Sequence, residues 1–170
     1  MISSSALTVS LTVLLVLPVL GAEQFVGTVV GISDGDTLSV MREGRAVKVR
    51  LYGIDTPERT QAFGTRARQY TSALAFGQVV TVVVKDQDRY GRLVAEVVLP
   101  DGQSLNRALV RAGLAWWYAA FAKRETTLQQ LEAEARDAKR GLWSDPHAVA
   151  PWEYRQHKRQ QPTTPKGTTP

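Results

Sequence analysis

The chain contains no cysteine and only two histidines, His147 and His157, in 170 residues. The absence of cysteine excludes disulfides, thiolate zinc sites, iron–sulfur clusters and a cysteine nucleophile. Two histidines are too few for a three-histidine metal site, and both lie near the C-terminus. An enzyme built from this sequence therefore has to use carboxylates and arginines for its chemistry.

Charged side chains are also absent from residues 1–22, within which residues 6–20 form an apolar run. This length suits the core of a signal peptide and is short for a membrane-spanning helix of about 20 residues. The basic segment that usually precedes such a core is missing. We therefore predict a signal peptide over residues 1–22 and a secreted or periplasmic protein, with an uncleaved membrane anchor as the alternative.

The remaining residues have the composition of one folded domain followed by a basic tail. Apolar residues make up 44% of the chain, which excludes global disorder. The formal charge is 21 − 16 = +5, and residues 151–170 contribute 4 − 1 = +3 of it. We place the domain at residues 23–152 and predict a disordered, basic, Pro/Thr-rich tail at residues 153–170.

Alternating and β-branched segments predict five strands, at residues 25–32, 37–42, 46–54, 79–84 and 93–99. The fourth has almost no polar alternation, which predicts burial on both faces or a place in a closed barrel. Three helices are expected. The first covers residues 63–74 and ends before Gly77, and the second is capped by Ser104 and ends at Gly113. The third runs from Leu128 to Gly141. Residues 114–121 are left unassigned. This order predicts an α+β fold, a five-stranded Greek-key β-barrel of the OB type.

Charged residues gather in three segments at strand ends or in loops, namely DGDT at 34–37, RLYGIDTPE at 50–58 and DRYGR at 88–92. Taken singly, each is also typical of a turn, a helix start or a solvated hairpin. Together they supply three acids and two arginines: Asp36, Asp55, Glu58, Arg50 and Arg92. Carboxylates bind hard cations such as Ca²⁺, Mg²⁺ or Mn²⁺, and one carboxylate can take a proton from water. Guanidinium groups bind phosphate oxygens. Phosphodiester cleavage requires such a set.

With these motifs, residues 25–152 resemble the staphylococcal nuclease (thermonuclease) family. LNRALVRAGLAW at 105–116 and GLWSDP at 141–146 extend the resemblance. It implies a Ca²⁺-dependent endonuclease and exonuclease that cleaves DNA and RNA. It further implies that the 5′-oxygen leaves, so that products end in a 3′-phosphate.

The resemblance also implies roles for individual residues. By this resemblance, the metal ligands would be Asp36, Asp55 and the main-chain oxygen of Thr56. Glu58 would act as the general base, and Arg50 and Arg92 would bind the phosphate during catalysis. The substrate would also contact Arg89, Tyr90 and Tyr118. No stable protein partner is implied, a monomer is expected, and a membrane is a partner only if the leader stays uncleaved.

Two other classes stay open at this point. One is a non-catalytic OB-fold module that binds nucleic acid or protein, and the other is a cell-envelope interaction protein tethered by its leader. Retention of every catalytic acid and arginine favours the enzyme, because binding alone needs no general base. Trp143 and Trp152 are predicted to pack the final helix against the barrel rather than to stack on bases.

Overall fold

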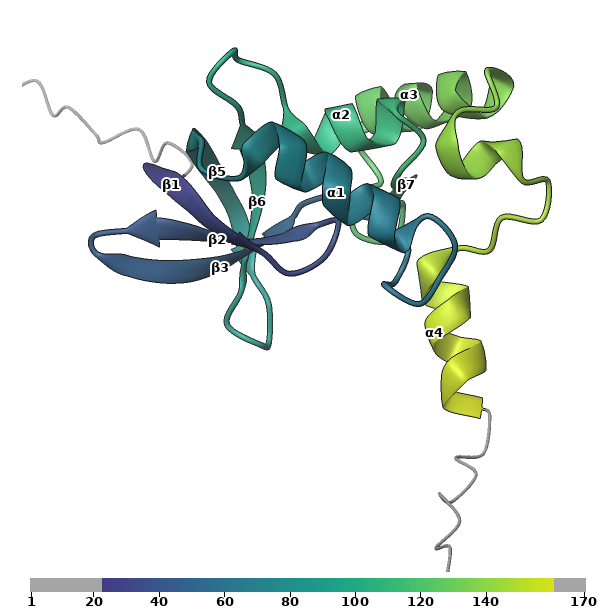
Figure 1. Ribbon diagram of the computed structural model, residues 1–170, viewed down its shortest axis with the longest axis horizontal. Coiled ribbons are helices and arrows are strands. Elements are labelled where there is room, and N and C mark those ends of the chain that lie inside the picture. Colours follow the sequence, from purple (N-terminus) through teal and green to yellow (C-terminus); the bar gives the residue numbers. More distant parts are fainter. Residues whose placement is uncertain (1–22, 161–170) are drawn as a thin grey trace, which may run out of the picture.

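The computed structural model describes residues 23–160 (Figure 1). The predicted signal peptide at residues 1–22 and the last ten residues of the predicted tail lie outside this range. Within it, no helix is both long and apolar enough to cross a membrane.

Five strands close into a barrel in the order β1-β2-β3-β6-β5. Their bounds are β1 Gln24–Ile32, β2 Thr37–Arg42, β3 Arg45–Leu51, β5 Val79–Gln87 and β6 Leu93–Val98. The first part of β1 pairs with β5 and the last part with β2, with an irregularity between Val29 and Gly31. Only β3 and β6 run parallel, with Arg50 opposite Val94. The prediction of an α+β, OB-type barrel is confirmed.

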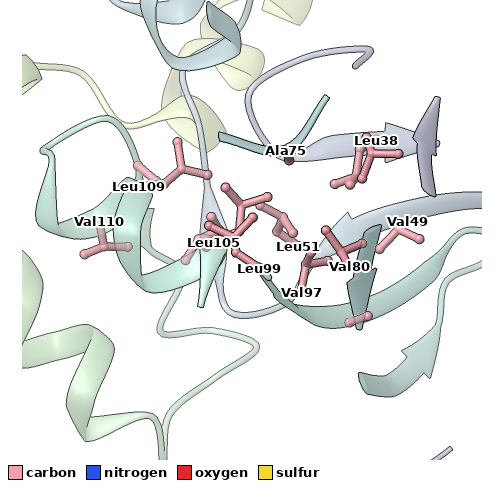
Figure 2. Close-up of a cluster of buried hydrophobic side chains, with 14 of the residues drawn as sticks. Leu38, Val49, Leu51, Ala75, Val80, Val97, Leu99, Leu105, Leu109 and Val110 are labelled. Carbon is pink, nitrogen blue, oxygen red and sulfur yellow. The ribbon is translucent and has the colours of Figure 1, made fainter. Parts of the chain in front are cut away.

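Alternate residues of the strands fill the barrel interior. The fully buried set includes Leu38, Val40, Val49, Leu51, Val80, Val82 and Val97, several of which are drawn in Figure 2. β5 belongs to the closed barrel and is buried on one face only, since its Val79 is 55% exposed. This alternation fits a small barrel whose inward side chains meet at the centre.

Two helices pack on the barrel, α1 (Gly64–Ala75) and α2 (Leu105–Arg111), and a third, α3 (Thr126–Asp137), lies on the other side of α2. Leu105 and Leu109 of α2 are fully buried and point toward the barrel residues Leu51 and Leu99 (Figure 2). The predicted cap is present, since the Ser104 side chain accepts a hydrogen bond from the Arg107 N–H. α3 packs on α2 and ends at Asp137, earlier than predicted, because Lys139 adopts φ 51° and breaks the helix. A 3₁₀ helix, η1 (Gly141–Ser144), follows.

A second, two-stranded sheet lies outside the barrel. It pairs β4 (Ile54–Asp55) with β7 (Trp116–Trp117), the latter inside the segment left unassigned from sequence. The predicted strand at 46–54 is interrupted because Gly53 has φ 75°, a conformation that favours glycine. The chain therefore leaves the barrel after Leu51 and carries Asp55 into this separate sheet.

The prediction of a disordered tail from residue 153 is wrong for residues 153–160, which belong to the helix α4 (Pro151–Gln160). The sequence of this segment is typical of a helix, because proline is favoured in the first turn. Glu153 near the start and the basic residues in the last turn also interact favourably with the helix dipole. Aromatic packing also holds α4 against the rest of the domain. Trp152 stacks on Tyr118 at a centroid distance of 5.0 Å and contacts Trp116 edge-on at 5.7 Å. Trp143 also packs on Trp116, at 4.3 Å. Both tryptophans therefore pack, as predicted, but against the region of β7.

We expect Leu51→Ala to lower the free energy of unfolding by about 2–5 kcal/mol, because it leaves a cavity at the centre of the barrel. Val79→Ala, on the exposed face of β5, is the control and should cost less than about 1 kcal/mol. Denaturant unfolding of both variants measures the difference. Equal losses would contradict the assignment of Leu51 to the barrel core.

Candidate active site

Two buried aspartates from different elements lie together at the end of β3. Asp36 follows the turn after β1 and is 1% exposed, and Asp55 ends β4 and is 0% exposed. The guanidinium of Arg50, the penultimate residue of β3, forms ion pairs with both, and its Nη2 lies 2.8 Å from Asp55 Oδ1. The second oxygen of Asp36 accepts a hydrogen bond from the Thr56 N–H at 2.8 Å. The DGDT and RLYGIDTPE segments therefore build one polar cluster.

The main chain of the DGDT turn is fixed against two neighbouring elements. The Leu51 N–H donates to the Asp36 carbonyl at 2.8 Å, and the Thr71 hydroxyl of α1 donates to the Gly35 carbonyl at 2.6 Å. A Cβ at Gly35 would lie within 2.9 Å of atoms of Thr56 and Ala67. Glycine is therefore required there for the turn to approach the loop after β4.

Glu58, in the loop after β4, is the third acid of the cluster. Its side chain is 41% exposed, and its Oε1 accepts a hydrogen bond from Arg155 Nη1 at 2.9 Å. Arg155 Nη2 lies 2.6 Å from Asp55 Oδ2, so this α4 residue bridges both carboxylates. Burial alone would lower the pKa of the Arg155 guanidinium, but its pairing with Asp55 and Glu58 outweighs burial and raises the pKa. The Arg155 guanidinium is therefore charged at any working pH.

Arg155 is not among the site residues predicted from the sequence, in which it is one of the charges of the basic tail. The proline, acidic and basic positions of residues 151–160 indicate a helix and are a signal that could have found α4. The contact itself joins residues 100 apart in sequence, and no local pattern indicates such a pairing.

The donor chemistry of the cluster fits a hard divalent cation. Asp36 and Asp55 both reach one guanidinium, so their carboxylates face a common region, and Thr56 contacts this region through its N–H, which donates to Asp36. Among residues 23–160, no three His, Cys, Asp or Glu side chains surround one point. The remaining ligands would therefore come from water or substrate. Three carboxylates against two guanidiniums give 2 − 3 = −1, a charge that favours a cation.

The third predicted segment, at residues 88–92, forms its own group in the β5–β6 loop. The Asp88 carboxylate accepts hydrogen bonds from the Tyr90 N–H at 2.9 Å, the Arg92 N–H at 3.0 Å and Arg92 Nε at 2.7 Å. Arg92 is the last residue of this loop and lies two residues before Val94, the β6 partner of Arg50. Its one ion pair in the described part of the chain is with Asp88.

The predicted substrate-binding residues lie in two places. Arg89 and Arg92 both face the ring of Tyr90, at 5.0 and 5.7 Å from its centroid, and Tyr90 is 71% exposed. Tyr118 lies elsewhere, with one ring face stacked on Trp152 of α4. Direct contacts thus join Asp36, Arg50, Asp55, Thr56 and, through Arg155, Glu58, whereas Arg89, Tyr90, Arg92 and Tyr118 lie outside this network.

An open pocket of about 380 Å³ adjoins the cluster on the side of Glu58. It is lined by Glu58, Thr60, Tyr154, Arg155, Lys158 and Arg159. The acid that is least buried therefore faces solvent across a basic surface, and an anion can approach it there.

We expect Asp88→Asn to lower stability at pH 7 more than at acidic pH. Burial alone would raise the pKa of the Asp88 carboxyl, but hydrogen bonds from Arg92 and Tyr90 outweigh burial and lower the pKa. The ionised form is favoured by folding, so its stabilising effect is present above the ordinary aspartate pKa of about 3.9 and is lost as the pH falls through the lower folded value.

Denaturant unfolding across a pH series measures this effect. Asp101→Asn is the matched control, because Asp101 also accepts a main-chain hydrogen bond two residues on but has no arginine partner within residues 23–160. The same stability difference between Asp88→Asn and the wild type at every pH would contradict the expectation.

The sequence is similar to a known family of nucleases and to several of their relatives. The model of the family described as staphylococcal nuclease homologue matches residues 48–145. A protein of Escherichia coli O157:H7 named an uncharacterized endonuclease is 44% identical over 132 residues, which are 78% of this chain and 86% of the relative. The micrococcal nuclease of Shigella flexneri is 42% identical over 156 residues, covering 86% of this chain and 90% of the relative. The staphylococcal-like nuclease CAN1 of Arabidopsis thaliana is 37% identical over 112 residues, 66% of this chain and 34% of the relative.

The matched region includes Arg50, Asp55, Glu58 and Arg92, and the relatives named as nucleases are similar over most of the described domain. The predicted family and the prediction of an enzyme are confirmed. The chain therefore belongs to the staphylococcal nuclease family and is a nuclease that hydrolyses phosphodiester bonds.

Proposed function

We propose that this nuclease depends on Ca²⁺ and cleaves both DNA and RNA, internally and from ends, leaving 3′-phosphate termini. One observation carries the proposal. Asp36 from the DGDT segment and Arg50, Asp55 and Glu58 from the RLYGIDTPE segment form one network, which Arg155 of α4 completes beside an open basic pocket. A module that only bound nucleic acid would need the basic surface, but not two buried carboxylates that share one arginine or a third carboxylate bridged to them.

Asp36, Asp55 and the main-chain oxygen of Thr56 are proposed to hold the metal ion. All three donors are oxygens, which Ca²⁺ prefers over nitrogen and sulfur. When bound, the ion would polarise a phosphate oxygen and offset the negative charge that builds up during the reaction. The preference for Ca²⁺ over Mg²⁺ rests on the family.

Glu58 is proposed as the general base. It is the one acid of the cluster that is substantially exposed, so water can reach it. Glu58 takes a proton from a water molecule as the water oxygen bonds to phosphorus. The bond from phosphorus to the 5′-oxygen breaks, its electron pair stays on that oxygen, and the oxygen takes up a proton from solvent. The phosphate remains on the 3′ side.

Arg50 and Arg92 are proposed to bind the non-bridging phosphate oxygens. Negative charge on these oxygens increases in the transition state, and one guanidinium group can bind two such oxygens through two parallel hydrogen bonds. Arg50 is already oriented by two buried aspartates, so little reorganisation accompanies the reaction. Arg92 is held by Asp88 of the same β5–β6 loop.

Arg89, Tyr90 and Tyr118 are proposed to contact the nucleic acid away from the scissile bond. The Tyr90 ring is 71% exposed and could stack on a base in place of Arg89 or Arg92, and stacking tolerates any sequence. Trp152 covers one ring face of Tyr118 and Phe121 packs against the ring at 4.8 Å, so Tyr118 would contact substrate through the part of its side chain that stays exposed. We further propose a monomer without a stable protein partner. Secretion or periplasmic location is proposed from residues 1–22 of the sequence.

We expect Glu58→Gln to fold like the wild type and to lose about 10²- to 10⁴-fold in turnover, the range for a positioned general base. Digestion of single-stranded DNA and of RNA by the wild type and the variant, each with Ca²⁺ and with EGTA, measures this. The wild type should cleave both substrates only with Ca²⁺ and leave 3′-phosphate ends.

Glu134→Gln, on the exposed side of α3, is the matched control and should cleave like the wild type. Cleavage by the wild type in EGTA would contradict the Ca²⁺ dependence, and wild-type turnover by Glu58→Gln would contradict the role of Glu58. Binding of DNA without cleavage in any divalent metal would contradict the proposed activity itself.

A further inference from the structure

We infer that Arg155 is a positioning residue for the reaction, holding the general base Glu58 in a fixed orientation beside the metal ligand Asp55. The inference rests on the proposed function of Glu58. It adds a residue from α4, a helix that the family match at residues 48–145 does not include.

The first argument is the geometry of the bridge. Arg155 Nη1 lies 2.9 Å from Glu58 Oε1, and Nη2 lies 2.6 Å from Asp55 Oδ2. Arg155 is the one ion-pair partner of Glu58 among residues 23–160. A planar guanidinium fixes the direction of both of its partners, which an ammonium group does not do. The position of Glu58 relative to Asp55 is therefore set by Arg155.

The second argument is what Glu58 lacks without this bridge. Its side chain is on a loop and is 41% exposed. Without the bridge, this side chain could therefore rotate about its three χ angles. Asp36 and Asp55, in contrast, are enclosed by the fold. A general base works only within hydrogen-bond reach of the proton it takes, so an unrestrained Glu58 would spend much of its time out of place.

The third argument is that α4 is attached to the Glu58 loop by contacts that do not involve Arg155. The hydroxyls of Tyr154 and Thr60 share a hydrogen bond of 3.0 Å, and Gln61 Nε2 donates to the Val149 carbonyl at 2.6 Å. Trp152 stacks on Tyr118 at the start of the helix. The backbone of Arg155 is therefore held in place before its side chain makes any contact, as preorganisation requires.

The same contacts allow a rival interpretation, in which Arg155 blocks the site. Arg155 approaches both oxygens of Asp55, at 2.6 and 3.3 Å, and a divalent cation seeks the same oxygens. If Arg155 mainly competed with the cation, its removal would tighten Ca²⁺ binding and raise activity. If it positions Glu58, its removal lowers turnover and does not tighten Ca²⁺ binding.

The test compares Arg155→Gln and Arg155→Lys with Arg45→Gln. Arg45 is exposed at the opposite end of β3, about 16 Å from Arg50 along the strand, and its variant makes the same change of charge. We expect Arg155→Gln to lose about 10- to 100-fold in kcat with KM changed by less than about threefold. Arg155→Lys should recover little, because an ammonium cannot span both carboxylates. Arg45→Gln should keep the wild-type kcat.

Two further readouts separate positioning from a general structural role. Adding Arg155→Gln to Glu58→Gln should cause little further loss, because Arg155 acts through Glu58. Nuclear magnetic resonance relaxation of the Glu58 side chain, which needs no activity, should show greater mobility in Arg155→Gln than in the wild type. Calorimetric titration with Ca²⁺ should give an affinity equal to or weaker than that of the wild type.

Tighter Ca²⁺ binding with equal or higher turnover in Arg155→Gln would overturn the inference in favour of competition. Unchanged mobility of Glu58, or a further full loss in the double variant, would also overturn it. Absence of cleavage by the wild type would instead contradict the proposed function. The relaxation measurement still decides in that case whether Arg155 holds Glu58 in place.

Discussion

The ion pairs of Arg50 with Asp36 and Asp55 are the interaction on which the rest of the site depends. Two carboxylates without solvent exposure are strongly unfavourable unless a cation and hydrogen bonds accompany them. Arg50 supplies the cation from the end of β3, and the Thr56 N–H supplies a hydrogen bond from the loop after β4. Such a buried network contributes little net stability, but it fixes geometry because losing one member leaves an unpaired charge.

The barrel and the site divide their tasks along the chain. Apolar residues such as Leu38 and Leu51 hold the strands together, and the polar residues sit directly beside them, at Asp36 and Arg50. Leaving the barrel at Gly53 then places Asp55, Thr56 and Glu58 outside the sheet but against it. The small β4–β7 sheet also brings Trp116 and Tyr118 to the place where α4 attaches. The closure of the barrel, the placement of the acids and the attachment of α4 therefore depend on one another.

Much of this could be predicted from the sequence where the signal is local. Alternation in residues 37–42, the Ser104 cap and the glycine after α1 gave correct elements, and their order gave the barrel. The DGDT and RLYGIDTPE motifs named acids that the fold does bring together. The break at Gly53 was missed because a single glycine does not interrupt the alternation that predicts one continuous strand. The helix α4 was missed because its polar, basic composition continues into the Pro/Thr-rich residues that follow it. The contact of Arg155 depends on tertiary packing across 100 residues, which no local pattern encodes.

The sequence separation of these contacts also has a consequence for how the molecule assembles. β1 pairs with β5, the Thr60 hydroxyl meets Tyr154 across 94 residues, and Asp55 meets Arg155 across 100. Closing such long loops costs chain entropy before any contact compensates for it, and chains dominated by distant pairings fold slowly. In a chain whose barrel is still open, nothing fixes Asp36 beside Arg50 or Arg155 beside Asp55. The complete active site therefore forms only when barrel closure and the attachment of α4 are both complete.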